Sequence, residues 1–377
     1  MNFDYSDDQK FLKNEARKFL DAHSTSAAVR VVLNDDAVSY DKALWKGVAE
    51  QGWLGAAIPE EFGGLGLGHV ELCAIAEELG RSVAPIPFAS TVYFVAEALM
   101  LAGNDAQKAD LLPKIAAGEI IGCYATSEGP GVVDAKSLTC KVEGDKLTGV
   151  KIPVTDGDIA DVALVLASEG GKPSLFLVDL NGEGVARETL KSLDPTRGVA
   201  KLTFSGAPAR RVGAAGEGLS ISEQVFDRAA VLLAFEQTGG ADKCLEMARQ
   251  YSLERYAFGR VIGGYQAIKH KLADIYVSVE IARSNAYYGA WALSTDAAEL
   301  PIAASVARIA ASDAGWLAAK ENVQTHGGMG YTWEGDAQLF YRRAKLLGLS
   351  LGATREWKRR LVGELKVSNA SLAPSAD

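Results

Sequence analysis

The first third of the chain shows the apolar spacing of amphipathic helices. A capping box of Ser6 and Gln9 precedes the first predicted helix, in which apolar residues recur every three or four positions. The apolar face of this helix consists of Phe11, Leu12, Ala16, Phe19 and Leu20. Further helices are predicted over 40–52, where Gly52 provides the stop, and over 69–81 and 89–103.

From about residue 113 the pattern changes to short apolar runs of the strand type. A strand pair that turns at Gly144-Asp145 is followed by the runs 161–168, 173–180 and 199–206. Val, Leu, Phe and Thr dominate these runs, and Gly and Asp separate them. This pattern predicts a small barrel or sandwich.

Long helical patterns then return, over 219–256, 265–295, 301–325 and 336–365, with Pro301 in a first helical turn. The third of these helices is rich in alanine, which lets helices pack closely and favours a four-helix bundle. The predicted fold class is therefore α+β, with an all-α N-terminal domain, a central β-barrel and a C-terminal four-helix bundle. The predicted divisions are 1–112, 113–214 and 215–366, with a flexible tail over 367–377.

Composition narrows the class of protein. Among 377 residues, 48 Asp and Glu against 39 Lys and Arg give a net charge of −9, which argues against a nucleic-acid partner or an anionic membrane. No apolar run reaches the roughly 18 residues of a membrane-spanning helix, and the first residues are not typical of a secretion signal, so a cytoplasmic protein is expected. The four cysteines and four histidines are scattered, so neither a disulfide framework nor a metal site is expected.

The connection within 253–275 is a candidate site for an anion. Arg255 ends one predicted helix, Phe258 and several glycines form the connection, and Gln266 begins the next helix. A guanidinium beside a free helix N-terminus suits a pyrophosphate. The alternative is an ordinary helix–turn–helix in which the arginine binds carbonyl groups of the helix end.

A second glycine-rich connection follows the third long helix. Gln324 lies in the last predicted turn, and Gly327 and Gly328 follow it. Glycines without a Cβ let the backbone approach a ligand closely, whereas the alternative is an ordinary helix cap in which His326 forms hydrogen bonds.

Two other segments have patterns of interest. The stretch 52–68 is either a compact loop shaped by Pro and Gly or part of a site. In the stretch 123–134, Thr126 and Ser127 could form hydrogen bonds with a planar heteroaromatic ring, or could simply lie on a polar strand edge.

Taken in this order, the four segments resemble the acyl-CoA dehydrogenase family over nearly the whole chain. The early loop motif of the family is matched by Gly52, Trp53, Pro59, Glu60, Gly63, Gly64 and Gly66. Its Arg-x-x-Phe-Gly segment is matched by Arg255, Phe258, Gly259, Ile262, Gln266, Ala267, Ala273 and Asp274. Its Gln-x-x-Gly-Gly-x-Gly motif is matched by Gln324, Gly327, Gly328 and Gly330.

The resemblance implies an FAD-dependent dehydrogenase that acts on an acyl-CoA. It implies that the FAD diphosphate and adenosine are bound across a subunit interface by Arg255, Phe258, Gln266, Gln324, Gly327 and Gly328. It implies that the flavin ring is contacted by Tyr124, Thr126, Ser127 and Thr155. The expected partners are the acyl-CoA, an electron-transfer flavoprotein or similar acceptor, and further subunits in a homotetramer or an α2β2 heterotetramer, with no nucleic acid and no membrane.

The sequence departs from the family at the catalytic base. The family's usual glutamate position falls on Leu351, and the alternative position in the first bundle helix falls on Ala229-Ala230. None of these side chains can accept the proton from the α-carbon. Near the flavin, Pro153 replaces a tryptophan and Val133 replaces a serine.

Two carboxylates are candidates for a relocated base. Glu236 lies seven residues after Ala229, so it shares that helix face about two turns on. Asp227 matches a position that lies near the substrate in the family, and Glu334 and Glu356 are weaker candidates. The alternative for Glu236 is a hydrogen bond inside the bundle or an ion pair between subunits.

The leading hypothesis is therefore an acyl-CoA dehydrogenase for a bulky or unusual acyl group. Gly348, Ser350 and Gly352 would leave room in the substrate cavity. The chain would be either a homotetramer with a relocated base or one subunit type of a heteromer whose other subunit supplies the base. A non-catalytic flavin-binding partner subunit, and a related flavin oxidase or monooxygenase, are the alternatives.

Overall fold

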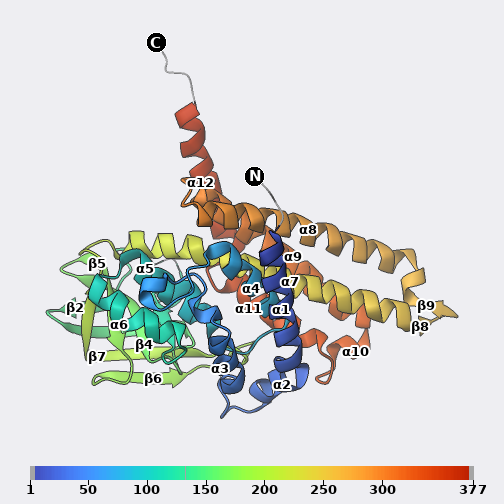
Figure 1. Cartoon of the computed structure of the whole chain (residues 1–377), viewed down its shortest axis with the longest axis horizontal. Helices are drawn as coiled ribbons and strands as arrows, with labels where there is room; N and C mark the ends of the chain where they lie inside the picture. The colour runs from blue at the N-terminus through green and yellow to red at the C-terminus, as the bar shows by residue number, and fades with distance from the viewer. Residues whose placement is uncertain (1–4, 132, 373–377) are drawn as a thin grey trace. The chain divides into compact units, whose positions relative to one another are not determined.

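The computed structural model describes residues 5–131 and 133–372 (Figure 1). Contacts divide the chain into two units. The helical unit comprises Met1–Ser26, His69–Ala84 and Ala230–Asp377, and the barrel unit comprises Ala27–Gly68 and Pro85–Ala229, each as far as it is described. The predicted domain boundaries follow the order of elements along the sequence, whereas these two units follow contacts in space.

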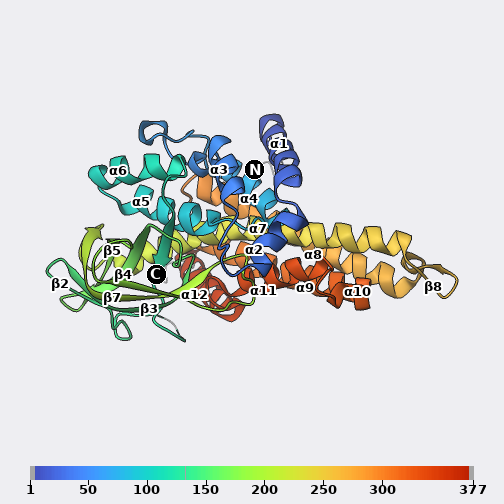
Figure 2. The ribbon, with the colours of Figure 1, turned by 90° about the horizontal axis from the view of Figure 1, so that it is seen from below.

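The helical unit is built around long helices that pack side by side. Its elements are α1 (Asp7–His23), α4 (His69–Arg81), the second part of α7 (Gly218–Glu254), β8 (Tyr256–Ala257), β9 (Arg260–Val261), η4 (Ile262–Gly264), α8 (Gln266–Ser294), α9 (Leu300–His326), α10 (Gly328–Tyr331), α11 (Ala337–Leu349) and α12 (Thr354–Leu372). Helices α8, α11 and α12 all pack on α9, and the short β8–β9 hairpin joins α7 to α8 (Figures 1 and 2).

Helix α1 begins at the predicted capping box. The Gln9 N–H donates to Ser6 Oγ at 3.2 Å, and the Ser6 N–H donates to Gln9 Oε1 at 2.9 Å. Ala16 and Leu20 are buried as the apolar pattern predicts, whereas Phe11 is 67% exposed. The capping prediction is thus confirmed, and the apolar face is narrower than its sequence pattern suggested.

Helices α4 and α7 cross at two reciprocal glycine contacts. A Cβ added at Gly80 would lie 1.8 Å from the Glu236 carbonyl oxygen, and one added at Gly239 would lie 1.8 Å from the Glu77 carbonyl oxygen. No side chain larger than hydrogen can stand at such a distance from a backbone atom, so both glycines are required by close packing.

The predicted single helix over 336–365 is wrong, because α11 ends at Leu349 and α12 begins at Thr354. Gly352 adopts a φ of +84°, which breaks the helical path. The Ser350 N–H donates to Leu347 O at 3.3 Å in a tightened last turn. The connection therefore forms a turn around Leu351, the position at which the resemblance predicts the family's base.

The barrel unit joins a closed sheet to short helices. Its elements are α2 (Ser26–Asn34), α3 (Lys42–Glu50), η1 (Trp53–Gly55), η2 (Glu60–Phe62), the π-helix η3 (Ala89–Ala96), α5 (Glu97–Ala102), α6 (Asp105–Ala116), β1 (Gly122–Ala125), β2 (Lys141–Glu143), β3 (Lys146–Thr155), β4 (Val162–Glu169), β5 (Lys172–Asp179), β6 (Val185–Thr189), β7 (Val199–Val212) and the first part of α7. Helix α2 and the π-helical geometry of η3 were not predicted from the sequence.

The sheet closes on itself, which confirms the barrel. Strands follow the order β1-β4-β2-β3-β7-β5, β6 pairs with β7, and a further pairing of β4 with β5 completes the ring. The Gly144-Asp145 turn joins β2 to β3 as predicted. Between β4 and β5, Gly170 and Gly171 both have positive φ, at 56° and 82°, as a two-residue hairpin turn requires.

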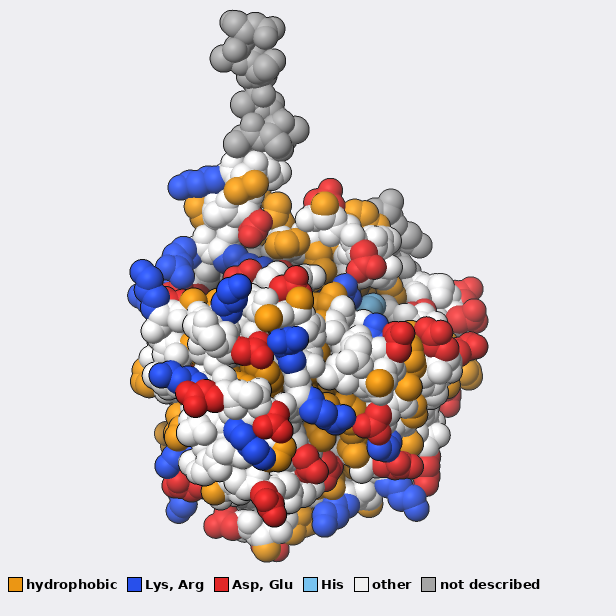
Figure 3. Space-filling model, turned by 90° about the vertical axis from the view of Figure 1, so that its left-hand side faces the viewer, with side chains coloured by type: hydrophobic (Ala, Val, Ile, Leu, Met, Phe, Trp, Pro, Cys, Tyr) orange, Lys and Arg blue, Asp and Glu red, His pale blue; other side chains and the backbone are white. Residues whose placement is uncertain are grey.

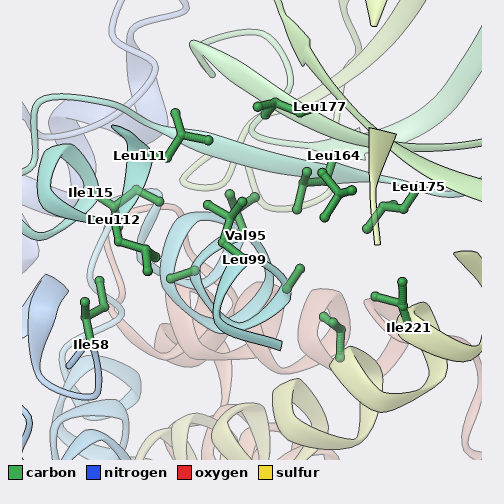
Figure 4. Packing of buried hydrophobic residues seen from close by; sticks show 14 of the residues in the cluster. Ile58, Val95, Leu99, Leu111, Leu112, Ile115, Leu164, Leu175, Leu177 and Ile221 are labelled. Carbon is green, nitrogen blue, oxygen red and sulfur yellow. The ribbon is translucent and has the colours of Figure 1, made fainter. Parts of the chain in front are cut away.

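One apolar cluster joins the barrel to the helices of this unit. Figure 4 shows Val95 and Leu99 between Leu111, Leu112 and Ile115 of α6 and the leucines of β4 and β5. The cluster members drawn there are nearly all below a few per cent exposed, for example Leu99 at 0% and Leu164 at 0%. The cluster packs η3, α5 and α6 against β4 and β5, and β1, which follows α6, pairs in parallel with β4.

Figure 3 shows acidic and basic side chains interspersed over one face of the molecule. None of the described helices is sufficiently long and apolar to cross a membrane. Within the described residues, no cluster of three or more His, Cys, Asp or Glu is placed to hold a metal ion.

Candidate active site

Tyr124 lies on β1, and its ring and hydroxyl are both engaged inside the barrel unit. Its Oη is 2.9 Å from Ser222 Oγ, and its ring contacts Phe94 and Phe226 at centroid distances of 6.0 and 5.9 Å. Burial raises the pKa of the Tyr124 phenol, so the hydroxyl stays protonated. Tyr124 is therefore a fixed neutral hydrogen-bonding group.

Thr126 and Ser127 follow β1 directly and are half-buried. The Ile152 N–H of β3 donates to Ser127 O at 2.9 Å, and Ser127 Oγ donates to Gly129 O at 3.2 Å. Thr155, at the end of β3, is exposed. The three hydroxyl residues thus belong to one unit and stand on two neighbouring segments of it.

Lys151 and Glu128 are polar residues of this region that the sequence analysis missed. Lys151 is 0% exposed, and its Nζ donates to Glu128 Oε1 at 2.7 Å and to Thr126 O at 3.0 Å. The signal was present in the sequence, because a lysine between Val150 and Ile152 is unusual in an apolar strand. Without a partner in view, that lysine had no assigned role.

Arg255, Phe258 and Gln266 lie at the far end of the α7–α8 hairpin. Arg255 follows the last residue of α7 and is exposed, and Phe258 is 96% exposed with a φ of +52°. Gln266 opens α8, whose N-cap residue Tyr265 provides no side-chain cap within the described residues. The Ile268 N–H donates to Tyr265 O at 3.1 Å, so the N–H groups that can bind an anion are those of Gln266 and Ala267.

The turn formed by Gln324–Gly328 ends α9, and packing within the described chain does not require its two glycines. Gly327 has φ +60° and ψ −135°, a conformation that glycine adopts without strain. A Cβ added at Gly327 or Gly328 would meet no described atom within 4 Å. Gly328 also has no positive φ. Neither its backbone conformation nor crowding by described atoms therefore explains why a glycine occupies position 328.

His326 has a structural role in this turn. Its ring stacks on Tyr251 at 4.3 Å, and its Nδ1 is 2.9 Å from Asn322 O. Because Tyr251 lies in the last turns of α7, this contact joins the ends of α7 and α9 within one helical unit. The two predicted anion-binding segments therefore extend from neighbouring helix ends.

The turn at Leu351 is held by buried donors on both sides. Trp357 Nε1 donates to Leu351 O at 2.9 Å, and an Nη of the buried Arg308 donates to Leu347 O. Leu351 is half-buried, and no carboxylate replaces it in the turn. Ala229 and Ala230, at the alternative base position, are fully buried at 0% exposure.

Glu236 lies in the interior of the helical unit beside Arg343. Its side chain is 1% exposed, and Oε1 is 3.5 Å from Arg343 Nη1. The cavity that both residues line measures about 10 Å³, which matches one water molecule and is far below the roughly 300 Å³ of a small ligand pocket. Glu236 as the base stays a prediction, and its observed surroundings are those of a buried ion pair.

Arg308 adds a second cation to this interior. Its Nη1 donates to Gln237 Oε1 at 2.5 Å, and burial lowers the pKa of the guanidinium to about 10. The group therefore remains charged at neutral pH. Arg343 is thus paired with the Glu236 carboxylate, whereas Arg308 is bound by neutral acceptors, the Gln237 amide oxygen and the Leu347 carbonyl.

Asp227, the second candidate base, is 4% exposed and belongs to the barrel unit. The neighbouring Arg228 places Nη1 3.5 Å from Glu97 Oε2. Asp227 as a base also stays a prediction. Of the weaker candidates, Glu334 is exposed, and Glu356 lies 2.9 Å from Arg359 Nη2 on α12.

This fold, with Arg255 and Gln324 exposed at helix ends, is that of a flavin-dependent dehydrogenase of the acyl-CoA class. Two family models match the chain, the acyl-CoA dehydrogenase N-terminal domain over residues 6–119 and the acyl-CoA dehydrogenase C-terminal domain over residues 216–365. A relative named acyl-CoA dehydrogenase IpdE2, from Mycobacterium tuberculosis, is 33% identical over 364 residues, which cover 95% of this chain and 98% of the relative. The chain belongs to the acyl-CoA dehydrogenase family.

Solved structures agree with this assignment. The steroid acyl-CoA dehydrogenase Tcur3481-Tcur3483, as a G363A variant, is 32% identical with a TM-score of 0.87, covering 97% of this chain and 99% of that chain. The ChsE4–ChsE5 complex from Mycobacterium tuberculosis is 27% identical with a TM-score of 0.88, again covering 97% and 99%.

Proposed function

We propose that the protein catalyses FAD-dependent α,β-dehydrogenation of an acyl-CoA thioester with a bulky acyl group, as one subunit type of a heteromer. As a member of its family it is an acyl-CoA dehydrogenase, an oxidoreductase whose cofactor is FAD. The proposal of a heteromer depends on one observation. The positions assigned to the cofactor keep their polar and glycine residues, whereas a leucine, Leu351, occupies the position of the base.

The residues present fit the cofactor. Arg255 offers a forked, permanently charged donor beside the open N-terminus of α8, which suits a diphosphate. Gly328 leaves room for close approach by a group from outside the chain, and the exposed ring of Phe258 can cover an apolar part of it. We assign these residues, with Gln266, Gln324 and Gly327, to the diphosphate and adenosine of FAD bound by a neighbouring subunit.

The barrel unit provides the hydroxyl groups for the flavin ring. Tyr124, Thr126, Ser127 and Thr155 orient the ring and limit the access of water to it. When bound, FAD supplies the acceptor for the hydride that leaves the β-carbon of the substrate. The proton of the α-carbon requires a carboxylate, which the Leu351 turn lacks.

A partner subunit is therefore proposed as the source of the base. Steroid side chains and other bulky acyl groups are the proposed substrates, because one similar protein is a steroid acyl-CoA dehydrogenase. A second similar structure, the ChsE4–ChsE5 complex, supports a heteromer. Around the Leu351 turn, a Cβ added at Gly348 or Gly352 would meet no described atom within 4 Å, which leaves space for a large group.

Association with further subunits is supported by apolar side chains exposed on α8. Tyr276, Val277 and Ile281 are 57%, 54% and 54% exposed in the single chain. Such a stripe on a long helix favours burial against another subunit. We propose a tetramer, with an electron-transfer flavoprotein or a similar protein as the electron acceptor.

The direct test is to purify the chain alone, record its flavin spectrum, and titrate a panel of acyl-CoAs without oxygen. The proposal predicts a yellow protein that is not bleached by any acyl-CoA until the base-carrying partner is added. Bleaching by short straight-chain acyl-CoAs in the isolated chain would contradict both the missing base and the bulky substrate. A colourless protein that takes up no FAD would contradict the cofactor assignment.

A second candidate function is a non-catalytic flavin-binding subunit, which the absence of a carboxylate at Leu351 and Ala229-Ala230 also favours. The two candidates differ in which flavin is reduced. Loading the chain with a flavin analogue whose visible band is strongly shifted, such as 8-mercapto-FAD, and its partner with FAD distinguishes the two flavins. Reduction confined to the partner's flavin would favour the non-catalytic function.

A further inference from the structure

Lys151 is an ammonium group enclosed in the barrel unit. Its side chain is 0% exposed, and both of the acceptors that its Nζ contacts, Thr126 O and Glu128 Oε1, belong to the segment that follows β1. Burying a lysine is unfavourable unless its charge is compensated. The charge of Lys151 is therefore directed at one short segment, at a backbone carbonyl and at a carboxylate.

Glu128 also forms hydrogen bonds with another part of the barrel. Its Oε2 accepts hydrogen bonds from the N–H and the hydroxyl of Thr139, both at 2.6 Å, and its Oε1 accepts one from the Cys140 N–H at 3.0 Å. Thr139 and Cys140 lead directly into β2. One carboxylate thus connects the segment after β1 to the start of β2, while Lys151 connects it to β3.

The anchored segment contains the hydroxyl residues assigned to the flavin. Thr126 is held at its carbonyl by Lys151, Ser127 is held at its carbonyl by the Ile152 N–H, and Glu128 is held at its carboxylate. With the backbone fixed at Thr126 and Ser127 and the next residue held at its carboxylate, the half-buried side chains of Thr126 and Ser127 have a defined direction.

We propose that Lys151, acting with Glu128, is a positioning residue that holds Thr126 and Ser127 in the orientation in which they bind the flavin ring. The proposal rests on the proposed FAD function. A buried ion pair contributes little net stability compared with apolar residues of the same volume, whereas it specifies one arrangement of its surroundings. Removing one partner alone leaves an unpaired buried charge and destabilises the fold, so the effect on cofactor binding is judged with both charges removed.

The test measures FAD binding and the environment of the flavin, neither of which requires an acyl-CoA. The variants are Lys151→Met, Glu128→Gln and the double variant Lys151→Met/Glu128→Leu, which removes both charges and leaves no unpaired ion. The matched control is Lys201→Met, because Lys201 also lies on a barrel strand and pairs with Glu188 at 3.2 Å, but is 38% exposed. FAD dissociation constants of the apoproteins, visible flavin spectra and unfolding free energies without FAD are compared.

The expected result is FAD binding weakened about tenfold or more in Lys151→Met and in the double variant, as for the loss of one charge-assisted hydrogen bond. The vibronic shoulders of the flavin band should also change, while Lys201→Met matches the wild type. Should Lys151→Met fail to fold, the double variant answers the same question. A folded double variant with unchanged FAD affinity and spectrum would overturn the proposal, whereas a wild type that binds no FAD would overturn the proposed function.

Discussion

Glu236 and Arg343 form an ion pair inside the helical unit, with 3.5 Å between Oε1 and Nη1 and side chains that are 1% and 4% exposed. Arg308, 1% exposed, lies in the same interior through its contacts with Gln237 and Leu347. The carboxylate thus compensates the charge of Arg343, whereas Arg308 is bound by an amide and a carbonyl oxygen. This relationship connects a candidate base to the stability of the bundle.

Replacing Glu236 by leucine is expected to lower the free energy of unfolding by about 3 kcal/mol or more, because Arg343 loses its carboxylate in a buried site. The double variant Glu236→Leu/Arg343→Met should recover part of this loss. Chemical denaturation of both variants and of Arg343→Met, with the exposed pair variant Glu15→Gln as control, measures the difference. Additive effects of the two substitutions would show that the pair is not coupled.

The same carboxylate allows a test of catalysis. Glu236→Gln keeps the shape of the side chain and removes its basicity. If Glu236 serves the ion pair alone, flavin reduction in the assembled enzyme should keep its rate once the variant is shown to be folded. A loss of 10²-fold or more, in the range of general-base catalysis, would instead establish Glu236 as the base.

Introducing a carboxylate at the Leu351 turn should create a base in this chain. The turn is fixed through Trp357 Nε1 and Arg308, so a glutamate at position 351 would be presented on a held backbone. Leu351→Glu should allow the isolated, FAD-loaded chain to be bleached by a bulky acyl-CoA under anaerobic conditions. Leu351→Gln is the matched control, with the same size and no basicity, and equal behaviour of the two variants would contradict the prediction.

The two glycines after Gln324 should respond differently to alanine. Gly327→Ala forces a side chain into a φ of +60° and is expected to cost about 1–2 kcal/mol of stability even without FAD. Gly328→Ala has open space and no positive φ, so the FAD-free protein should keep its stability. If Gly328 faces a neighbour's cofactor, FAD affinity should nevertheless fall, which isothermal titration of both apoproteins measures.

Because of Glu128, the free energy of unfolding should fall as the pH is lowered. Although burial opposes ionisation, hydrogen bonds from Lys151, Thr139 and Cys140 lower the pKa of its carboxyl to about 2. Since the folded pKa lies below the ordinary value near 4.3, the contribution is complete above about pH 5 and is lost as pH falls from there towards 2. Denaturation of the wild type and Glu128→Gln between pH 7 and pH 3 should give stability curves that converge in acid, and parallel curves would contradict this assignment.

Much of the fold could be predicted because its signals are local. The Ser6 capping box, the glycine stop after α3, the start of α9 at Pro301 and the hairpin turns all follow from neighbouring residues. The break between α11 and α12 was missed because LLGLSLGAT keeps helical apolar spacing. The structure shows why the chain turns there: Gly352 adopts a positive φ, and Arg308 and Trp357 bind the carbonyls of Leu347 and Leu351.

The residues of the candidate site also differ in whether the sequence alone could identify them. Gly327 and Gly328 could be found because glycines at a helix end are visible in the sequence. Lys151 could not, because its significance depends on Glu128, 23 positions away. Glu236 was noticed through its helix face, yet its partner Arg343 is separated from it by 107 positions and belongs to another helix.

The reciprocal glycine contacts between α4 and α7 also restrict how this bundle can change. Each helix carries a Glu-x-x-Gly sequence, and the glycine of one lies on the glutamate carbonyl of the other. A slide of one helical turn, or a rotation of either helix, would drive a Cβ into a backbone oxygen. The close contact of the two backbones therefore fixes how deeply the side chains of Glu77 and Glu236 are buried. A new activity along α7 can arise by substitution of side chains, but not by a shift of the helix along its axis.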